Sequence, residues 1–371
     1  MTTSAVPIRK LTGRIGLAIV GLIVGVFLAE FVAKLIAPKG GAELLFNAPD
    51  AYPRGLYIPD AELMKVPAPG FSGEINSIGY TVPIRINDLG LRGPAHEPVA
   101  DSAQWLAIGD SFALSLQVPE SETYARQVSA QTPFALLNGG VDGYSTWQST
   151  GRYLRLAEQV QLDGTVLVFF LGNDLVDNTR LRRGDPNGPT HPVPELDPMD
   201  PVIRWLFGHS YLYAHWRVFD HRREITQGRT MTSAQWQKEL RIFHADGSRD
   251  LNRLQRASKL ALSELNQVTR SRGDSLIVAI APPAFQVHSD RAAATFQMVG
   301  LEPERAALSA PGEAILQTLA DLGIPACDLT ADLVAAAESG EKLYFQYDGH
   351  WNQRGHAVVT ETLIQCLGSL P

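Results

Sequence analysis

The run Thr165–Leu171, TVLVFFL, constrains the fold of this chain more than any other stretch. It is continuously apolar and rich in residues that favour β-structure, so it predicts a strand buried on both faces. Similar runs occur at Trp105–Gly109, Phe134–Gly140, Ser275–Pro283 and Ile324–Leu329. Strands that alternate with helices predict a parallel sheet covered by helices on both faces.

Helical patterns separate and follow these runs. We expect helices over Ser121–Ala130, Ser145–Val160, Leu251–Arg270, Arg305–Leu322 and Asn352–Leu367. Ser121 is predicted to cap the first helix, and Pro311 to interrupt the fourth. The long third helix is amphipathic, and its expected apolar stripe contains Leu254, Leu260, Leu262 and Leu265.

The N-terminal segment is the strongest compositional signal. Ile15–Ala29 carries no charge, Arg9, Lys10 and Arg14 precede it, and the apolar character continues past Glu30 to Ala37. Residues 15–37 therefore match the roughly 20 residues that a membrane-spanning helix needs. The basic residues before the span favour a cytoplasmic N-terminus, which predicts a periplasmic or other extracytoplasmic globular part.

A cleaved signal peptide is the alternative for this segment. The stretch Phe31-Val32-Ala33 places the bulky Phe31 where a signal-peptide cleavage site requires a small residue, which favours an uncleaved anchor.

The apolar segment also contains residues spaced for helix contacts. Gly21 and Gly25 form a small-residue face that could contact another helix. Glu30 and Lys34 are spaced to form an ion pair.

Charge and cysteine content exclude several classes of function. The chain of 371 residues has a net charge of −7, and no Lys/Arg-rich run supports nucleic-acid binding. Its two cysteines, Cys327 and Cys366, form no metal-binding motif, so no structural metal site is expected. A disulfide and two buried free thiols remain open for this pair.

The remaining segments complete the expected organisation of the chain. Residues 1–38 form a cytoplasmic tail and anchor, 39–100 a lead-in with short β elements, and 101–371 the main α/β domain. An aromatic and proline-rich insertion at about 175–250 follows the third strand. It contains Trp205, Tyr211, Tyr213 and Trp216, and we expect a helical cap beside the strand ends.

Polar residues gather where the strands end. Gly109-Asp110-Ser111 follows the first strand, Asn138–Ser145 the second, and Gly172-Asn173-Asp174 the third. Asp348 and His350 lie in a loop before the final helix. Because ligands bind at the carboxyl ends of parallel strands, these groups are candidates for a Ser-His-Asp acyl-transfer site.

These blocks and their order resemble those of the SGNH (GDSL) hydrolases, which are named for a Ser, a Gly, an Asn and a His in four blocks. The resemblance covers residues 104–371. It implies a flavodoxin-like, doubly wound parallel sheet and ester hydrolysis or acyl transfer without a cofactor. It further implies that Ser111 is the nucleophile, His350 the general base and Asp348 the group that orients His350. The oxyanion hole would comprise the backbone N–H groups of Ser111 and Gly143 and the side chain of Asn173.

One feature departs from the usual pattern of this family. The acid and the histidine are separated by one residue instead of two, which is similar to the alginate-acetyltransferase branch of the superfamily. In an extended segment, residues two apart point to the same side, so we expect Asp348 to reach His350.

Three functions remain open from the sequence. The first is a membrane-anchored serine esterase that removes acyl groups from a glycan, a lipid or a small ester. The second is an O-acyltransferase acting on an envelope polysaccharide, and the third is a non-catalytic assembly module. The expected partners are an acylated carbohydrate or small ester and, through residues 15–37, membrane lipid.

Overall fold

The computed structural model of the chain describes residues 8–36, 53, 55–77, 79–95, 102–179, 206, 210–226, 239–346 and 348–370. Its main body is a five-stranded sheet with the strand order β6-β5-β7-β8-β9, in which all neighbouring strands are parallel. The strands are β5 (Ala103–Gly109), β6 (Phe134–Asn138), β7 (Gly164–Phe170), β8 (Ser275–Ala281) and β9 (Ala326–Asp328). This is the flavodoxin-like order, and it confirms the predicted doubly wound α/β fold.

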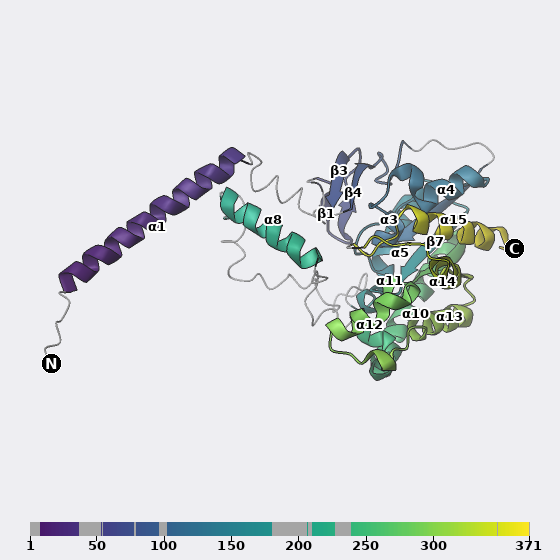
Figure 1. The fold of residues 1–371 in the computed structure, drawn as a ribbon. Helices are drawn as coiled ribbons and strands as arrows, with labels where there is room; N and C mark the ends of the chain where they lie inside the picture. Colours follow the sequence, from purple (N-terminus) through teal and green to yellow (C-terminus); the bar gives the residue numbers. More distant parts are fainter. Residues whose placement is uncertain are drawn as a thin grey trace.

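Helices cover both faces of the sheet (Figure 1). They include α4 (Tyr124–Gln131), α5 (Thr146–Ala157), α10 (Ser248–Arg272), α12 (Ser289–Met298), α13 (Ala310–Leu322), α14 (Thr330–Glu338) and α15 (Gln353–Gly368). Short helices follow strand ends at α3 (Ser111–Leu114), α6 (Asp174–Asp177) and α11 (Ala284–Val287). Single 3-10 turns cover Glu120–Glu122, Arg241–Phe243, Ala245–Gly247 and Pro303–Arg305.

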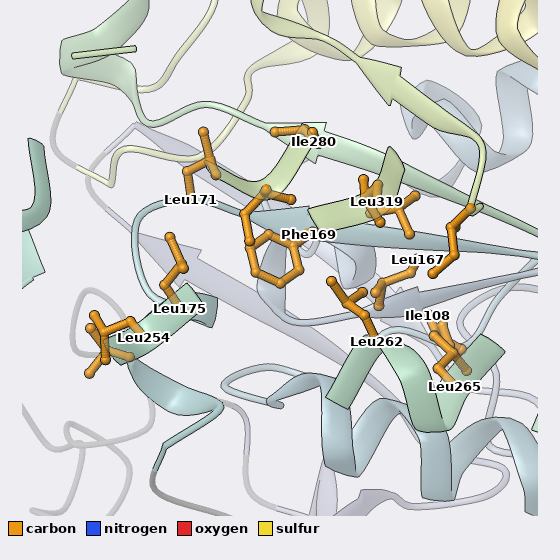
Figure 2. Close-up of a cluster of buried hydrophobic side chains, with 14 of the residues drawn as sticks. Ile108, Leu167, Phe169, Leu171, Leu175, Leu254, Leu262, Leu265, Ile280 and Leu319 are labelled. Atoms are coloured by element: carbon orange, nitrogen blue, oxygen red, sulfur yellow. The ribbon is translucent and has the colours of Figure 1, made fainter. Parts of the chain in front are cut away.

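The core lies on both sides of the sheet because side chains alternate along each buried strand. In β7, Leu167 and Phe169 face α10 and α13, whereas Val166 and Val168 face the layer that contains α15. Figure 2 shows Phe169 among leucines of the α10 side. Phe169 is fully buried.

The helix ends differ in detail from the sequence prediction. Thr123, and not Ser121, caps α4, because Ser121 lies in a 3-10 turn. Pro311 lies in the first turn of α13, where a missing N–H costs nothing, and therefore starts that helix instead of interrupting it. Leu260 is 57% exposed and is not part of the buried stripe that holds Leu254, Leu262 and Leu265.

The lead-in forms two antiparallel hairpins. The first pairs β1 (Tyr57–Asp60) with β2 (Met64–Pro67), and the second pairs β3 (Ser72–Ser77) with β4 (Tyr80–Arg85). Ile75, Val82 and Ile84 pack with Leu114 and Leu116, which follow the end of β5. The second hairpin is thereby held close to the edge of the sheet that carries the candidate site.

A disulfide joins Cys327 in β9 to Cys366 in α15, with their Cα atoms 5.8 Å apart. The sequence left a disulfide and free thiols open, and the structure has the disulfide. The bond ties the edge strand of the sheet to the last helix.

Two helices lie apart from the sheet (Figure 1). Helix α1 (Ile8–Ile36) contains Gly16–Leu35, a stretch with a mean hydropathy of 2.4 and none of it buried, which is long and apolar enough to cross a membrane. Helix α8 (Tyr211–Thr226) belongs to the insertion, and its N-terminus contacts α1. Trp205 lies outside the described residues.

Candidate active site

Ser111 lies at the C-terminal end of β5, at the first position of α3. The turn between strand and helix depends on Gly109, whose φ is +139° and where a Cβ would lie 2.5 Å from the carbonyl oxygen of Val168. Asp110 follows as the N-cap, and its carboxylate accepts a hydrogen bond of 2.9 Å from the Phe112 N–H. This turn holds the Ser111 hydroxyl at the strand end.

The structure brings Ser111, His350 and Asp348 together, although Ser111 is far from the other two in the sequence. The Nε2 atom of His350 lies 2.7 Å from the Ser111 Oγ, and its Nδ1 lies 2.5 Å from the Asp348 Oδ1. With a proton on Nδ1, the imidazole donates to Asp348 and Nε2 is left to accept the serine proton. A hydroxyl, a base and an orienting carboxylate in this order are the parts of a serine nucleophile.

The segment that carries Asp348 and His350 is a tight turn, so the expectation of an extended segment is wrong. Gly349 between them has a φ of +82°, a region that side chains with a Cβ rarely adopt. The Asp348 Oδ1 accepts a second hydrogen bond, of 3.1 Å, from the His350 backbone N–H. The turn at Gly349 brings the Asp348 carboxylate back to the His350 ring, so the two side chains meet although only one residue separates them.

Tyr80 is a site residue that the sequence analysis missed. Its hydroxyl donates a hydrogen bond of 2.7 Å to the Asp348 Oδ2, while Oδ1 bonds His350. Tyr80 comes from the second hairpin of the lead-in, and its ring lies 4.9 Å from that of Phe345. The alternating pattern of β4 predicts which residues face inward, but nothing in it marks a contact with a loop more than 260 residues away.

Electrostatics favour an ionised Asp348 beside a basic His350. Burial on its own raises the pKa of Asp348, but the charge of His350 and the bonds from His350 and Tyr80 hold it below its ordinary value. Burial lowers the pKa of His350, and the opposing effect of Asp348, with smaller contributions from Asp110 and Asp142, raises it to about 8. The imidazole therefore accepts a proton readily.

The groups predicted for the oxyanion hole also lie at strand ends. Among the residues that the structure describes, the N–H groups of Ser111 and Gly143 have no hydrogen-bond acceptor. Gly143 has a φ of +69° and open space where a Cβ would be, which leaves its N–H accessible to a ligand. These two N–H groups are free to bind a developing oxyanion.

The amide of Asn173 lies beside Asp110, and its hydrogen bond lowers the pKa of that carboxyl against the larger, opposite effect of burial. Asn173 precedes α6 but does not cap it through its side chain, and its Oδ1 is buried without a partner among the described residues. The NH2 group of Asn173 carries two hydrogens, so it can donate to a ligand.

Two other acidic residues near the site, Asp110 and Asp174, have structural contacts. Burial raises the pKa of Asp110 to about 7 and that of Asp174 well above its usual range. Asp174 accepts a hydrogen bond from the Phe170 N–H. A second histidine near the site, His356, is buried on α15 and accepts a hydrogen bond from the Tyr124 N–H. Burial lowers its pKa to about 3, so it is a poor general base.

Aromatic rings form the apolar side of the site. The ring of Phe112 lies 4.7 Å from that of His350 and stacks on Phe170 at 3.8 Å. Trp351 is 1% exposed and packs edge-on against Phe112, so it belongs to the core. Of the aromatic residues of the insertion, Tyr211 lies against Lys34 of α1.

Gly349→Ala is expected to lower kcat by roughly tenfold. A residue with a Cβ destabilises this left-handed turn by about 1–2 kcal/mol, and a turn that relaxes moves Asp348 out of alignment with His350. Gly340→Ala is the matched control. Gly340 has a φ of +95° and open space around it, like Gly349, but lies at the end of α14. If both variants keep the wild-type kcat, the turn does not determine the alignment.

Comparison with known proteins agrees with this geometry. Residues 243–369 match the family described as "SGNH hydrolase-like domain, acetyltransferase AlgX". This part of the chain is similar to an SGNH hydrolase-like domain. The resemblance seen in the sequence is thereby confirmed, and the matched residues include Asp348 and His350 but not Ser111.

Solved structures show a looser similarity. A lipolytic protein of the G-D-S-L family from Veillonella parvula is 14% identical, with a TM-score of 0.39, and the match covers 72% of this chain and 100% of that one. A catalytic mutant of the acetylxylan esterase Axe2 from Geobacillus stearothermophilus is 11% identical, with a TM-score of 0.39, over 74% of this chain and 98% of that one. No curated protein sequence matches the chain significantly.

Proposed function

We propose that this protein is a serine esterase or acyltransferase that forms an acyl-enzyme on Ser111. The observation that carries the proposal is the 2.7 Å contact between the Ser111 Oγ and the His350 Nε2, with Asp348 on the other ring nitrogen. A non-catalytic assembly module has no need of this arrangement.

The chemistry follows from the positions of the donors and acceptors. His350 takes the hydroxyl proton as the Ser111 Oγ attacks the ester carbonyl, and Asp348 stabilises the imidazolium. The carbonyl oxygen becomes an anion facing the N–H groups of Ser111 and Gly143 and the Asn173 amide. His350 then gives its proton to the leaving alcohol, which departs and leaves the acyl group on Ser111. Water or a second alcohol, deprotonated by His350, then attacks the acyl carbonyl, the bond to the Ser111 Oγ breaks, and His350 returns the proton to that oxygen.

Acyl transfer to a carbohydrate is the second candidate function. The observation that favours it is the match to a domain described as that of an acetyltransferase. A transferase must position its acceptor to compete with water for the acyl-enzyme. An envelope polysaccharide is the acceptor that we propose, because α1 would hold the domain next to the membrane.

We further propose that α1 anchors the domain outside the cytoplasmic membrane. Its apolar stretch Gly16–Leu35 has the length of a membrane span, and basic residues precede it. The disulfide between Cys327 and Cys366 supports an oxidising compartment, in which such bonds persist.

An assay of acyl partition tests this proposal. The full-length protein in detergent is given p-nitrophenyl acetate, with and without a deacetylated polysaccharide from the envelope of its producing organism. We expect release of p-nitrophenol in both cases, and acetyl esters on the polysaccharide if transfer is the function. Acetate as the sole product favours the esterase, and no release of p-nitrophenol would contradict both functions.

The rate is also expected to depend on pH through His350. Because its pKa is raised to about 8, the imidazole is protonated below that pH and cannot accept the Ser111 proton. The kcat/KM for p-nitrophenyl acetate should fall by about tenfold per pH unit below the pKa and level off above it. A profile that is flat between roughly pH 6 and 9 would contradict the assignment of His350 as the base.

A further inference from the structure

Helix α8 of the insertion is fixed to the apolar helix α1 through Glu30. The Glu30 carboxylate accepts hydrogen bonds from the Ser210 hydroxyl at 2.9 Å and from the N–H groups of Tyr211 and Leu212. Lys34 lies over the ring of Tyr211, 5.7 Å from its centre. A carboxylate at a helix N-terminus is stabilised by the unpaired N–H groups and the helix dipole.

These contacts explain how the charged Glu30 can lie within the apolar stretch of α1. Glu30 lies inside the stretch Gly16–Leu35, where an isolated carboxylate is costly. The sequence suggested Lys34 as its partner, but the structure gives it the start of α8. The start of α8 is therefore placed at the level of Glu30.

The level of Glu30 corresponds to a membrane–water interface. Glu30 precedes Leu35, the last residue of the apolar stretch, by five positions, which is about 8 Å along a helix. Interfacial helices lie with their apolar face buried about 5–10 Å into the boundary between headgroups and acyl chains. Figure 1 shows α8 diverging from α1 beyond this contact instead of running along it.

One face of α8 exposes large apolar side chains. Leu212, Trp216 and Phe219 are 43%, 54% and 68% exposed, and their spacing places them on one side of the helix. Tyr213 lies beside Trp216, with their ring centres 5.9 Å apart. Tryptophan and tyrosine are the residues that gather at membrane interfaces, where their rings contact both apolar and polar groups.

We propose that α8 lies in the outer membrane–water interface, with Leu212, Trp216 and Phe219 inserted between the lipids. The occupant of this face is the lipid bilayer, because α8 is joined to a membrane-span helix at the depth of the interface. This inference rests on the proposed position of α1 and not on the chemistry at Ser111. Helices α1 and α8 then form two attachments that hold the catalytic domain beside the bilayer.

Fluorescence quenching in vesicles tests the position of α8. Full-length Phe219→Cys is labelled with an environment-sensitive dye and inserted into phosphatidylcholine–phosphatidylglycerol vesicles that carry nitroxide lipids. Leu212→Cys is a second probe of the same face. Val26→Cys reports on α1, and Met298→Cys, an exposed apolar residue of α12, is the matched control. The native cysteines form a disulfide, so unsubstituted protein gives the background labelling.

We expect the dyes at 212 and 219 to be quenched several-fold more by a nitroxide near the headgroup than by one at the chain end. The dye at 26 should show the reverse order, and the dye at 298 should show no quenching. Dyes on α8 that behave like the dye at 298 would overturn the proposal. Dyes that are shielded from water but not quenched would indicate that protein, such as a second copy of this chain, covers the face. If the dye at 26 is not quenched, α1 does not span the bilayer and the proposal for α8 is overturned. That result would not bear on catalysis at Ser111.

Discussion

Ser111→Ala is expected to abolish ester hydrolysis while the protein remains folded. The Ser111 hydroxyl is the only group placed 2.7 Å from the His350 Nε2 in the part of the chain that the structure describes, so no other nucleophile is activated by this base. Loss of a serine of this kind lowers kcat by about 10⁶-fold in proteases that use the same arrangement. Hydrolysis of p-nitrophenyl acetate measures the loss.

His350→Ala should lower kcat by a similar factor, and the double variant by no more than either single variant, because the two residues act as one unit. Ser339→Ala, which removes an exposed hydroxyl at the end of α14, is the control and should keep the wild-type rate. Thermal unfolding checks that each variant is folded. Wild-type turnover by a folded Ser111→Ala variant would refute the assignment.

Asn173→Ala is expected to lower kcat by about 10²–10³ with little change in KM, because an oxyanion donor acts mainly in the transition state. The Asn173 amide lies beside Asp110 at the strand end next to Ser111, and its Oδ1 has no partner among the described residues. No part of α6 depends on its side chain as a cap. Steady-state kinetics separates the two constants.

Asn266→Ala controls for the loss of an amide elsewhere. Its amide donates to the Leu322 carbonyl and has no contact with the site, so both constants should stay unchanged. If Asn173→Ala raises KM and leaves kcat intact, Asn173 binds substrate and does not stabilise the oxyanion. If it changes neither constant, the oxyanion hole consists of backbone N–H groups alone.

The fold could be predicted from the sequence because its strands are buried on both faces. Runs such as Thr165–Leu171 became β7 and its neighbours in the expected parallel sheet, and their ends placed Ser111, Gly143 and Asn173 at one edge. The errors lie where local patterns compete. Ser121 and Thr123 are both suitable caps, and only the preceding 3-10 turn selects Thr123.

Contacts between distant segments could not be predicted in this way. Periodicity does not show that Tyr80 reaches Asp348, or that Tyr211 lies against Lys34 of α1. The spacing of Asp348 and His350 indicated that the two side chains meet. The expectation that they lie in an extended segment was wrong, because Gly349 between them adopts a left-handed conformation and forms a turn.

The assignment of Ser111 as the nucleophile is tested by the reaction of the folded, full-length protein with a fluorophosphonate probe, followed by mass spectrometry of its peptides. The probe reacts with activated serines and requires no knowledge of the substrate. We predict a single adduct on Ser111, formed fastest above the His350 pKa of about 8 and much more slowly in His350→Ala. No adduct, or an adduct on another serine with Ser111 unmodified, would contradict the proposal that Ser111 is the nucleophile.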